Sequence, residues 1–210
     1  MKNNYNHIAP VYDSLSRLVF GRAQVNVQRD LLASVVASSR ILIVGGGTGW
    51  ILEELAALCP AGLAITYVEI SSEMLRIAKR RPIGSNLVEF LAEDIQDYSA
   101  AKCSYDVIIT PFLFDNFLNS TAKKVFFQLD ALLSAKGIWL YADFYLDPRK
   151  ESSWKKGLLF LMYKFFGCVC RIEAQTLVDM APYFQGSGYR ELFCSFRYAG
   201  FIKGIVYQKP

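Results

Sequence analysis

The glycine-rich segment at positions 45–49 constrains the fold of this chain more than any other feature. It reads Gly45-Gly46-Gly47-Thr48-Gly49 and follows the wholly apolar run at 41–44. Such a run is typical of a parallel strand that is covered on both faces of its sheet. Glycines permit a sharp turn and a close approach of the backbone to a ligand, and the next helix offers free N–H groups to an anion. The segment therefore predicts an α/β sheet whose ligand lies where this strand ends.

Strand and helix patterns alternate along the chain up to Pro148. Apolar runs predict strands at 41–44, 64–70, 86–91, 105–110 and 138–143. Helical spacing and caps predict helices at 14–36 (in two parts that break at Gly21), 50–58, 71–81 with Ser71 as the cap, and 120–134. This order indicates a doubly wound α/β sheet, in which ligands bind at the carboxyl ends of the strands near the reversal of strand order.

Beyond Pro148 the pattern changes. An apolar helix at 154–170 and a second helix at 174–184 precede two strands at 189–198 and 201–208, which turn at Ala199-Gly200. This terminal hairpin predicts an antiparallel, mixed edge for the sheet.

Two further carboxylates follow predicted strands. Glu69 ends the second strand, 20 residues after Gly49, where it can accept hydrogen bonds from both hydroxyls of a ribose. Asp94 ends the third strand and can accept from an adenine amino group while Ile95 packs on the ring. The alternative is that these carboxylates are solvated loop residues without a ligand. For Asp94 and its neighbour Glu93 the two interpretations are close to equal, whereas for Glu69 the ligand-binding role is favoured.

The segments around these residues resemble the class I S-adenosylmethionine-dependent methyltransferases. The matching stretches are ILIVGGGTGWILEEL, YVEISSEMLRIAKRR, FLAEDIQDY, YDVIITPFLFDNF and GIWLYADFYLDP. The opening YNHIAPVYDSLSRLVFG is similar to that of ubiquinone/menaquinone-biosynthesis C-methyltransferases and related small-molecule enzymes. The resemblance implies a Rossmann-like sheet of seven strands, and S-adenosylmethionine as cofactor with S-adenosylhomocysteine as product and no metal. The implied cofactor-binding residues are Tyr12, Gly45, Gly46, Gly47, Thr48, Gly49, Glu69, Ile70, Met74, Asp94, Ile95 and Thr110.

We expect one methyltransferase domain over residues 1–210. Its parts are an amino-terminal helical lid at 1–38, a cofactor-binding core at 39–148, a helical insertion or lid at 149–186, and the carboxyl-terminal hairpin at 187–210.

One position departs from the family pattern. The family usually carries an acidic residue two positions before the first glycine, and Ile43 stands there. The cofactor's ammonium group would then meet backbone carbonyls, water or another carboxylate. A catalytically silent cofactor-binding or assembly protein of the same fold therefore remains an alternative. A nicotinamide oxidoreductase is disfavoured because Trp50 occupies the last, small-residue position of the dinucleotide pattern.

The acceptor side is predicted from the loops after the fourth and fifth strands and from the amino-terminal lid. Methyl transfer from a sulfonium needs alignment, and it needs a base only where the acceptor must lose a proton. The candidate bases are Asp115, Asp143 and His7, although a solvated, capping or incidental role is the simpler reading of each. The predicted acceptor-binding residues are Tyr5, Phe112, Phe114 and Tyr145. The sequence Thr110-Pro111-Phe112-Leu113 departs from the N/D-P-P-Y/F motif of amine and nucleic-acid base methylases.

The segment at 154–166 is apolar on more than one helical face. It therefore predicts a helix that is buried, dimerised or in contact with lipid, flanked by lysines that suit an anionic membrane. A core helix with snorkelling lysines is slightly favoured. Our hypothesis for its function is a lid over a small hydrophobic or aromatic acceptor, with a homodimer and peripheral membrane contact left open.

Composition excludes several classes. The net charge of +4 and the lack of a basic stripe near the site argue against nucleic acid as a partner. The chain has five cysteines without a C-x-x-C motif and a single histidine, which predicts reduced thiols and no metal site. The polar amino end lacks a leader, and the apolar stretch at 157–170 contains Lys164, so a cytoplasmic protein is expected.

Overall fold

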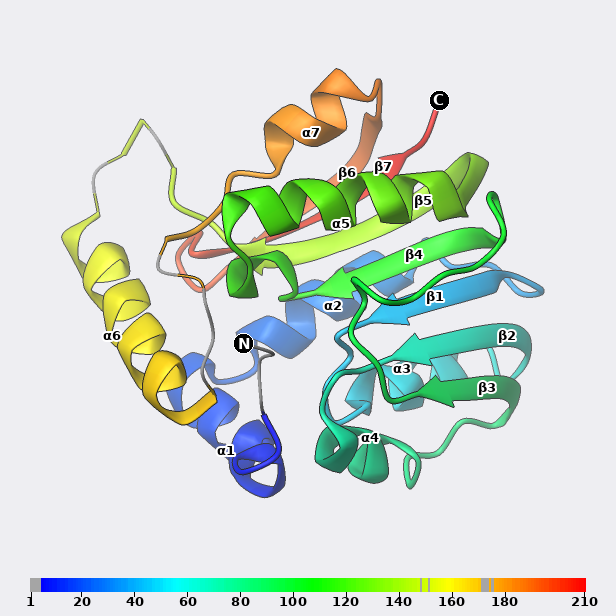
Figure 1. The fold of residues 1–210 in the computed structure, drawn as a ribbon, viewed down its shortest axis with the longest axis horizontal. Coiled ribbons are helices and arrows are strands. Elements are labelled where there is room, and N and C mark those ends of the chain that lie inside the picture. Colours follow the sequence, from blue (N-terminus) through cyan, green and yellow to red (C-terminus); the bar gives the residue numbers. More distant parts are fainter. Residues whose placement is uncertain (1–4, 148, 151, 171–173, 175) are drawn as a thin grey trace.

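A seven-stranded sheet forms the centre of the computed structural model, which describes residues 5–147, 149–150, 152–170, 174 and 176–210. The strand order is β3-β2-β1-β4-β5-β7-β6 (Figure 1). The strands are β1 Arg40–Val44, β2 Ala61–Val68, β3 Ser85–Leu91, β4 Tyr105–Pro111, β5 Leu133–Phe144, β6 Arg190–Arg197 and β7 Ile202–Gln208. The first five run parallel, and β7 pairs antiparallel with both β5 and β6. The predicted doubly wound, mixed sheet with a terminal hairpin is confirmed.

Helices cover both faces of this sheet. They are α1 Ala9–Phe20, α2 Ala23–Leu32, α3 Trp50–Leu58, α4 Ser72–Ala78, α5 Asn119–Leu132, α6 Ser153–Cys170 and α7 Ala181–Gly186. Helices α2, α3 and α4 contribute to one hydrophobic core, and α5 and α7 contribute to the core on the opposite face. The apolar strand residues alternate between the two cores, as Ile41 and Leu42 do in β1. This explains the unbroken apolar run that the sequence shows there.

The point where strand order reverses lies at β1. The chain adds β2 and β3 on one side of this strand and β4 on the other (Figure 1). In sheets of this kind the diverging loops leave a crevice at the carboxyl ends of the two central strands. The glycine segment after β1 and the loop after β4 therefore both border that crevice.

Several predicted boundaries are wrong by a few residues. The first helix begins at Ala9 instead of residue 14, with Pro10 in its first turn, where a missing N–H is harmless. The last helix begins at Ala181 instead of residue 174, again with a proline, Pro182, in its first turn. The described residues 174 and 176–180 are not helical. The break at Gly21 and the Ser71 cap, whose hydroxyl accepts from the Met74 N–H, are as predicted.

The reading of the apolar segment as a core helix is wrong. Only Leu159 and Cys170 of α6 are buried, whereas Phe160 and Leu161 are 63% and 64% exposed. The helix stands at the side of the sheet, next to α1 (Figure 1). Phe166 of α6 packs against the rings of Tyr5 and Tyr12, with centroid distances of 6.1 and 6.5 Å.

Candidate active site

The glycine segment is shaped by the strand next to it. A Cβ atom at Gly46 would lie 2.4 Å from the hydroxyl oxygen of Tyr67, whose ring fills the space beneath the turn. The same hydroxyl donates a hydrogen bond to the Gly47 carbonyl oxygen at 3.0 Å. Gly49 has φ +77° and is the N-cap residue of α3, where a Cβ atom would lie 2.6 Å from the Cβ of Ala78. The loop thus needs glycine for close packing as well as for its backbone conformation.

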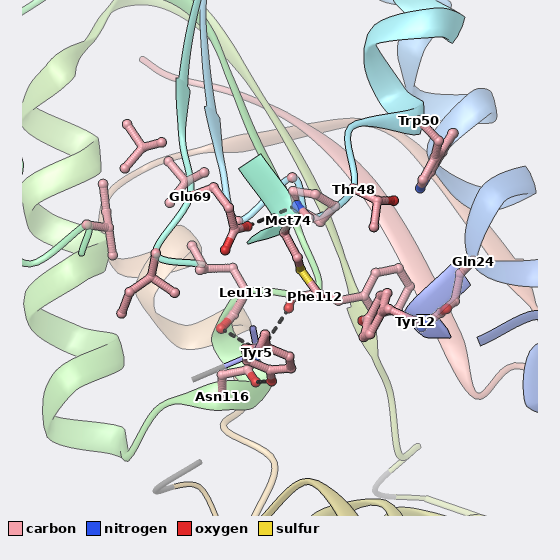
Figure 2. A pocket seen from close by; sticks show the side chains of 18 of the residues that line it. Tyr5, Tyr12, Gln24, Thr48, Trp50, Glu69, Met74, Phe112, Leu113 and Asn116 are labelled. Carbon is pink, nitrogen blue, oxygen red and sulfur yellow. Dashed lines mark hydrogen bonds between the residues drawn. The ribbon is translucent and has the colours of Figure 1, made fainter. Parts of the chain in front are cut away.

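Glu69 is fixed at the end of β2 with its carboxylate facing the crevice (Figure 2). Its two oxygens accept from the backbone N–H groups of Gly47 at 3.0 Å and Ser71 at 2.9 Å. Burial raises the pKa of this carboxyl, and the backbone N–H groups oppose that shift. A carboxylate offers about four lone-pair positions, so about two remain for a ligand.

A cavity of about 540 Å³, here called the outer cavity, lies in front of these groups. Its volume falls within the range of about 300–1,000 Å³ that small-molecule sites occupy. It gathers the predicted residues Tyr12, Gly45, Gly46, Gly47, Thr48, Glu69, Ile70, Met74, Asp94 and Ile95. Asp94 is buried and accepts from the Gln96 N–H at 3.0 Å, and Ile95 is 4% exposed. Most of the predicted cofactor-binding residues therefore line the same cavity.

Position 43, where the family usually carries an acid, lies in the hydrophobic core. Ile43 is fully buried among the apolar residues beneath β1 and does not line the outer cavity. Another carboxylate, Asp13 of α1, does line it and accepts from the Thr48 hydroxyl at 2.7 Å. Arg81 donates to this carboxylate at 2.9 Å and to the Thr48 carbonyl oxygen at 3.0 Å. Sequence reasoning missed both Asp13 and Arg81, because no local pattern announces an ion pair between residues 68 positions apart.

A second cavity of about 280 Å³, here called the inner cavity, lies beneath α6. Its walls come from α1, from the segment after β4, from the last residue of β5, and from α6. Six residues line both cavities: Tyr5, Tyr12, Ser16, Gln24, Phe112 and Asn116. Tyr5 donates to the Asn116 amide oxygen at this junction (Figure 2). Phe112 has φ +50°, a conformation that a bulky residue rarely adopts and that places its ring against Phe144 at 5.2 Å.

Two acidic residues lie at the inner cavity. Asp115 lines it, and Asp143 lies behind with 1% of its surface exposed. Asp143 accepts from the Asp115 N–H at 3.3 Å and from the Phe144 N–H at 2.8 Å. Burial raises the pKa of Asp143 to about 7. Burial first, and then the Asp143 charge, also raise the pKa of Asp115 well above its usual value.

Besides Asp143, four predicted site residues have side chains that do not line either cavity. Thr110 is buried and accepts from the Trp139 indole N–H at 2.9 Å, and Phe114 is buried beside the same ring. Tyr145 lies under the Lys203 ammonium group, and His7 is exposed on the surface. Gly49, whose role is in the loop itself, also lies outside the walls. The sequence alone does not show which face of a strand, or which side of a loop, each of these side chains occupies.

Within the described part of the chain, no group of three His, Cys, Asp or Glu side chains is arranged to hold a metal ion. No helix among the described residues has the length and apolar character needed to cross a bilayer.

Comparison with known proteins supports the family on three counts. A family model described as a methyltransferase domain matches residues 41–137. A demethylmenaquinone methyltransferase of Porphyromonas gingivalis is 32% identical over 120 residues, covering 55% of this chain and 49% of the relative. A malonyl-[acyl-carrier protein] O-methyltransferase of Bacillus cereus is 34% identical over 150 residues, covering 69% of this chain and 52% of the relative. The chain thus spans about half the length of these curated relatives.

Among solved structures, the 1,6-didemethyltoxoflavin-N1-methyltransferase of Burkholderia thailandensis, with bound 1,6-didemethyltoxoflavin and S-adenosylhomocysteine, has the same fold. The TM-score is 0.66 at 14% identity, with 97% of this chain and 85% of that chain covered. The sheet order defines a Rossmann-like fold, and the outer cavity lies at the carboxyl ends of its strands. The chain belongs to the class I S-adenosylmethionine-dependent methyltransferase superfamily.

S-adenosylmethionine is the cofactor of this superfamily, and the outer cavity fits it. The oriented Glu69 carboxylate suits a ribose, the buried Asp94 and Ile95 suit an adenine, and the open glycine loop accommodates the amino-acid end. The matches to methyltransferases do not favour the silent alternative.

Proposed function

We propose that the chain transfers a methyl group from S-adenosylmethionine, bound in the outer cavity, to a small hydrophobic or aromatic acceptor in the inner cavity. The observation that carries this proposal is the shared wall between the two cavities. A donor and an acceptor placed on either side of Phe112 would meet at that wall. In the four-part organisation proposed here, 1–38 and 149–186 close the cavities, 39–148 hold the cofactor, and 187–210 complete the sheet.

On the cofactor side, each contact has a physical reason. Glu69 would accept from the ribose hydroxyls with the lone pairs that its backbone partners leave free, and Asp94 would accept from the adenine amino group. Arg17, exposed at the rim of the outer cavity, would pair with the carboxylate of the methionine part. Asp13 would face its ammonium group in place of the usual acid at position 43.

Bound S-adenosylmethionine supplies a methyl group on a positively charged sulfur, which leaves as a neutral thioether. The chain's own residues then have to align and desolvate the reactants. Holding two reactants in line can contribute about 7–11 kcal/mol at best. Phe112, locked by its backbone conformation and by Phe144, would set the approach, while Tyr5 and Tyr12 would exclude water from the junction.

The experiment has two arms. Calorimetry with S-adenosylhomocysteine measures the cofactor site, and a screen of apolar compounds with methyl-labelled S-adenosylmethionine measures transfer. We expect binding, and transfer that Met162→Trp abolishes by filling the inner cavity while cofactor binding is kept. Binding without any transfer across the screen would instead support the silent protein, and no binding would overturn the proposal.

We also propose that the outer face of α6 contacts an anionic membrane surface, from which an apolar acceptor could enter. Phe160 and Leu161 of α6 and Leu18 of α1 are 63%, 64% and 83% exposed. The helix contains three lysines and no acidic residue. Apolar side chains with flanking cations suit the boundary of a bilayer that carries negative headgroups.

Sedimentation with phosphatidylserine vesicles and with neutral phosphatidylcholine vesicles tests this contact. We expect binding to the anionic vesicles that the double change Phe160→Ser and Leu161→Ser weakens. Phe193→Ser on β6, at a side chain that is 44% exposed, serves as the control. Equal binding to neutral vesicles, or a dimer that the same double change breaks, would overturn the membrane contact.

A further inference from the structure

The lining of the inner cavity is mostly apolar and, among the described residues, contains a single acidic side chain, Asp115. Six apolar or aromatic residues of α6 and Phe144 at the end of β5 face the cavity. Among the described residues that line it there is no lysine, arginine or histidine. A ligand that brings a negative charge would therefore find no cation to pair with.

Asp115 is paired with a second acidic residue, Asp143. The Asp115 N–H donates to Asp143, so the two residues are held together by the backbone. Two carboxyls that are buried side by side cannot both ionise easily, because each charge disfavours the other and neither is solvated. Burial raises the pKa of both groups, and no cation is among the causes that act on either. The pair can therefore accept a proton more readily than a solvated carboxylate does.

A hydroxyl group without a partner lies on the same wall. The Tyr163 oxygen of α6 is buried and makes no hydrogen bond to any described residue. Tyr163 and Asp115 line the same cavity. A buried hydroxyl that is left unpaired is unfavourable, so it calls for a ligand or water as its partner.

We propose that the inner cavity selects an uncharged aromatic alcohol, whose hydroxyl group is bound by Asp115 and Tyr163. The inference rests on the proposed function and names its acceptor class. The hydroxyl oxygen forms a bond to the methyl carbon as the carbon–sulfur bond breaks, and the sulfur keeps that electron pair. The hydroxyl proton passes to the Asp115–Asp143 pair and returns to solvent after the product leaves. Asp115 is thus the catalytic base, and a carboxylate acceptor such as a malonyl group is excluded by charge.

Matched probes test the selectivity without turnover. We would titrate the protein, saturated with S-adenosylhomocysteine, with 1-naphthol, 1-naphthoate and 1-naphthylmethylamine, which share one ring system and differ in charge. We expect 1-naphthol to bind at least about 10-fold more tightly than 1-naphthoate, since a hydrogen bond to a charged group is worth about 1.5–3 kcal/mol. Equal affinity for the naphthoate, or tighter binding of the ammonium compound, would overturn the proposed class.

Variants locate the selectivity. Asp115→Asn should weaken 1-naphthol about 10-fold and leave 1-naphthoate unchanged or tighter, and Tyr163→Phe should weaken 1-naphthol alone. Glu89→Gln, an exposed acid on β3, and Tyr183→Phe, whose hydroxyl bonds to Asn119 outside the cavity, are the controls. Melting temperature and S-adenosylhomocysteine affinity are measured for every variant, so that unfolding is recognised.

The two proposals fail separately. If S-adenosylhomocysteine does not bind, the proposed function fails. If it binds and neither Asp115→Asn nor Tyr163→Phe changes the affinity for 1-naphthol in a folded protein, only the acceptor inference fails.

Discussion

The outer and inner cavities touch, yet they are built in opposite ways. One side of the outer cavity comes from short segments that directly follow β1, β2 and β3, where backbone N–H groups hold Glu69 in place, and α1 and α2 close the other side. The inner cavity is formed by side chains of α1, of α6, of the segment after β4 and of the end of β5, which lie far apart in the sequence. Its ionisable residues are buried against apolar rings.

The two cavities differ in which interactions fix the positions of their residues. A site made by strand ends inherits its geometry from the hydrogen-bonded sheet. A site made by packed helices depends on how well separate elements meet, and it can bury charge that would otherwise be solvated. We therefore expect changes in the outer cavity to act on cofactor affinity, and changes in the inner cavity to act on protonation and acceptor choice.

The largest expected effect is the pH dependence that the inner cavity gives to folding. The pKa of Asp143 is about 7 in the folded chain, against a usual value of 3.8. Between these values the folded state holds a proton that the unfolded state has lost, so the free energy of unfolding falls as the pH rises from about 4 to 7. At about 1.4 kcal/mol per pH unit, this contribution is at most about 4 kcal/mol.

Denaturant titrations of the wild type and Asp143→Asn across this pH range measure the effect. The variant should lose part of the slope, with Asp115 and Glu69, whose pKa values are also raised, supplying the rest. Asp106→Asn is an opposite control, because the Arg40 hydrogen bond lowers the pKa of Asp106 and its contribution is lost only in stronger acid. An unchanged slope in Asp143→Asn would show that this carboxyl titrates normally.

The next effect belongs to the outer cavity. Glu69→Ala removes the carboxylate proposed to accept from two ribose hydroxyls, each worth about 1.5 kcal/mol or more. Calorimetry should show S-adenosylhomocysteine binding weakened about 100-fold. The exposed Glu89→Gln should leave the affinity unchanged. A loss of less than a few fold in Glu69→Ala would mean that the ribose lies elsewhere.

A pair of glycine substitutions compares the rigid loop with the exposed lid. A Cβ atom at Gly46 collides with the buried Tyr67 ring, so Gly46→Ala should destabilise the fold by about 1–3 kcal/mol. Gly157, in α6, has no atom within 4 Å of such a Cβ. Gly157→Ala should therefore stabilise the chain by up to about 1 kcal/mol through helix propensity. Thermal melts read both changes, and equal effects would remove the contrast between the two regions.

The smallest expected effect lies on the outer face of α6. Phe160 is exposed, so Phe160→Ser should change the free energy of unfolding by no more than about 0.5 kcal/mol. Its neighbour Leu159 is 6% exposed, and Leu159→Ala should cost at least about 2 kcal/mol. If Phe160→Ser is as damaging as Leu159→Ala, the outer face is packed and is not available for a membrane.

Prediction from the sequence succeeded where the signal was local. The glycine segment, Glu69 and Asp94 were predicted to share a site because the carboxyl ends of parallel strands meet at one edge of a sheet, and they line one cavity. Thr110 and Phe114 were expected at the same site but do not line either cavity. Each belongs to the right strand end or turn but faces the core. A change of one residue in a strand reverses the face, and sequence patterns do not fix that register so finely.

The sequence by itself determined the sheet, the glycine turn and the class of ligand, since hydrophobic periodicity and glycine act over a few residues. Only the tertiary structure decided that one face of α6 is left exposed, that Asp13 lies beside the glycine loop, and that Asp115 donates its N–H to the buried Asp143. These outcomes depend on contacts between elements dozens of residues apart. Such contacts follow from the packing of whole faces, which local composition does not encode.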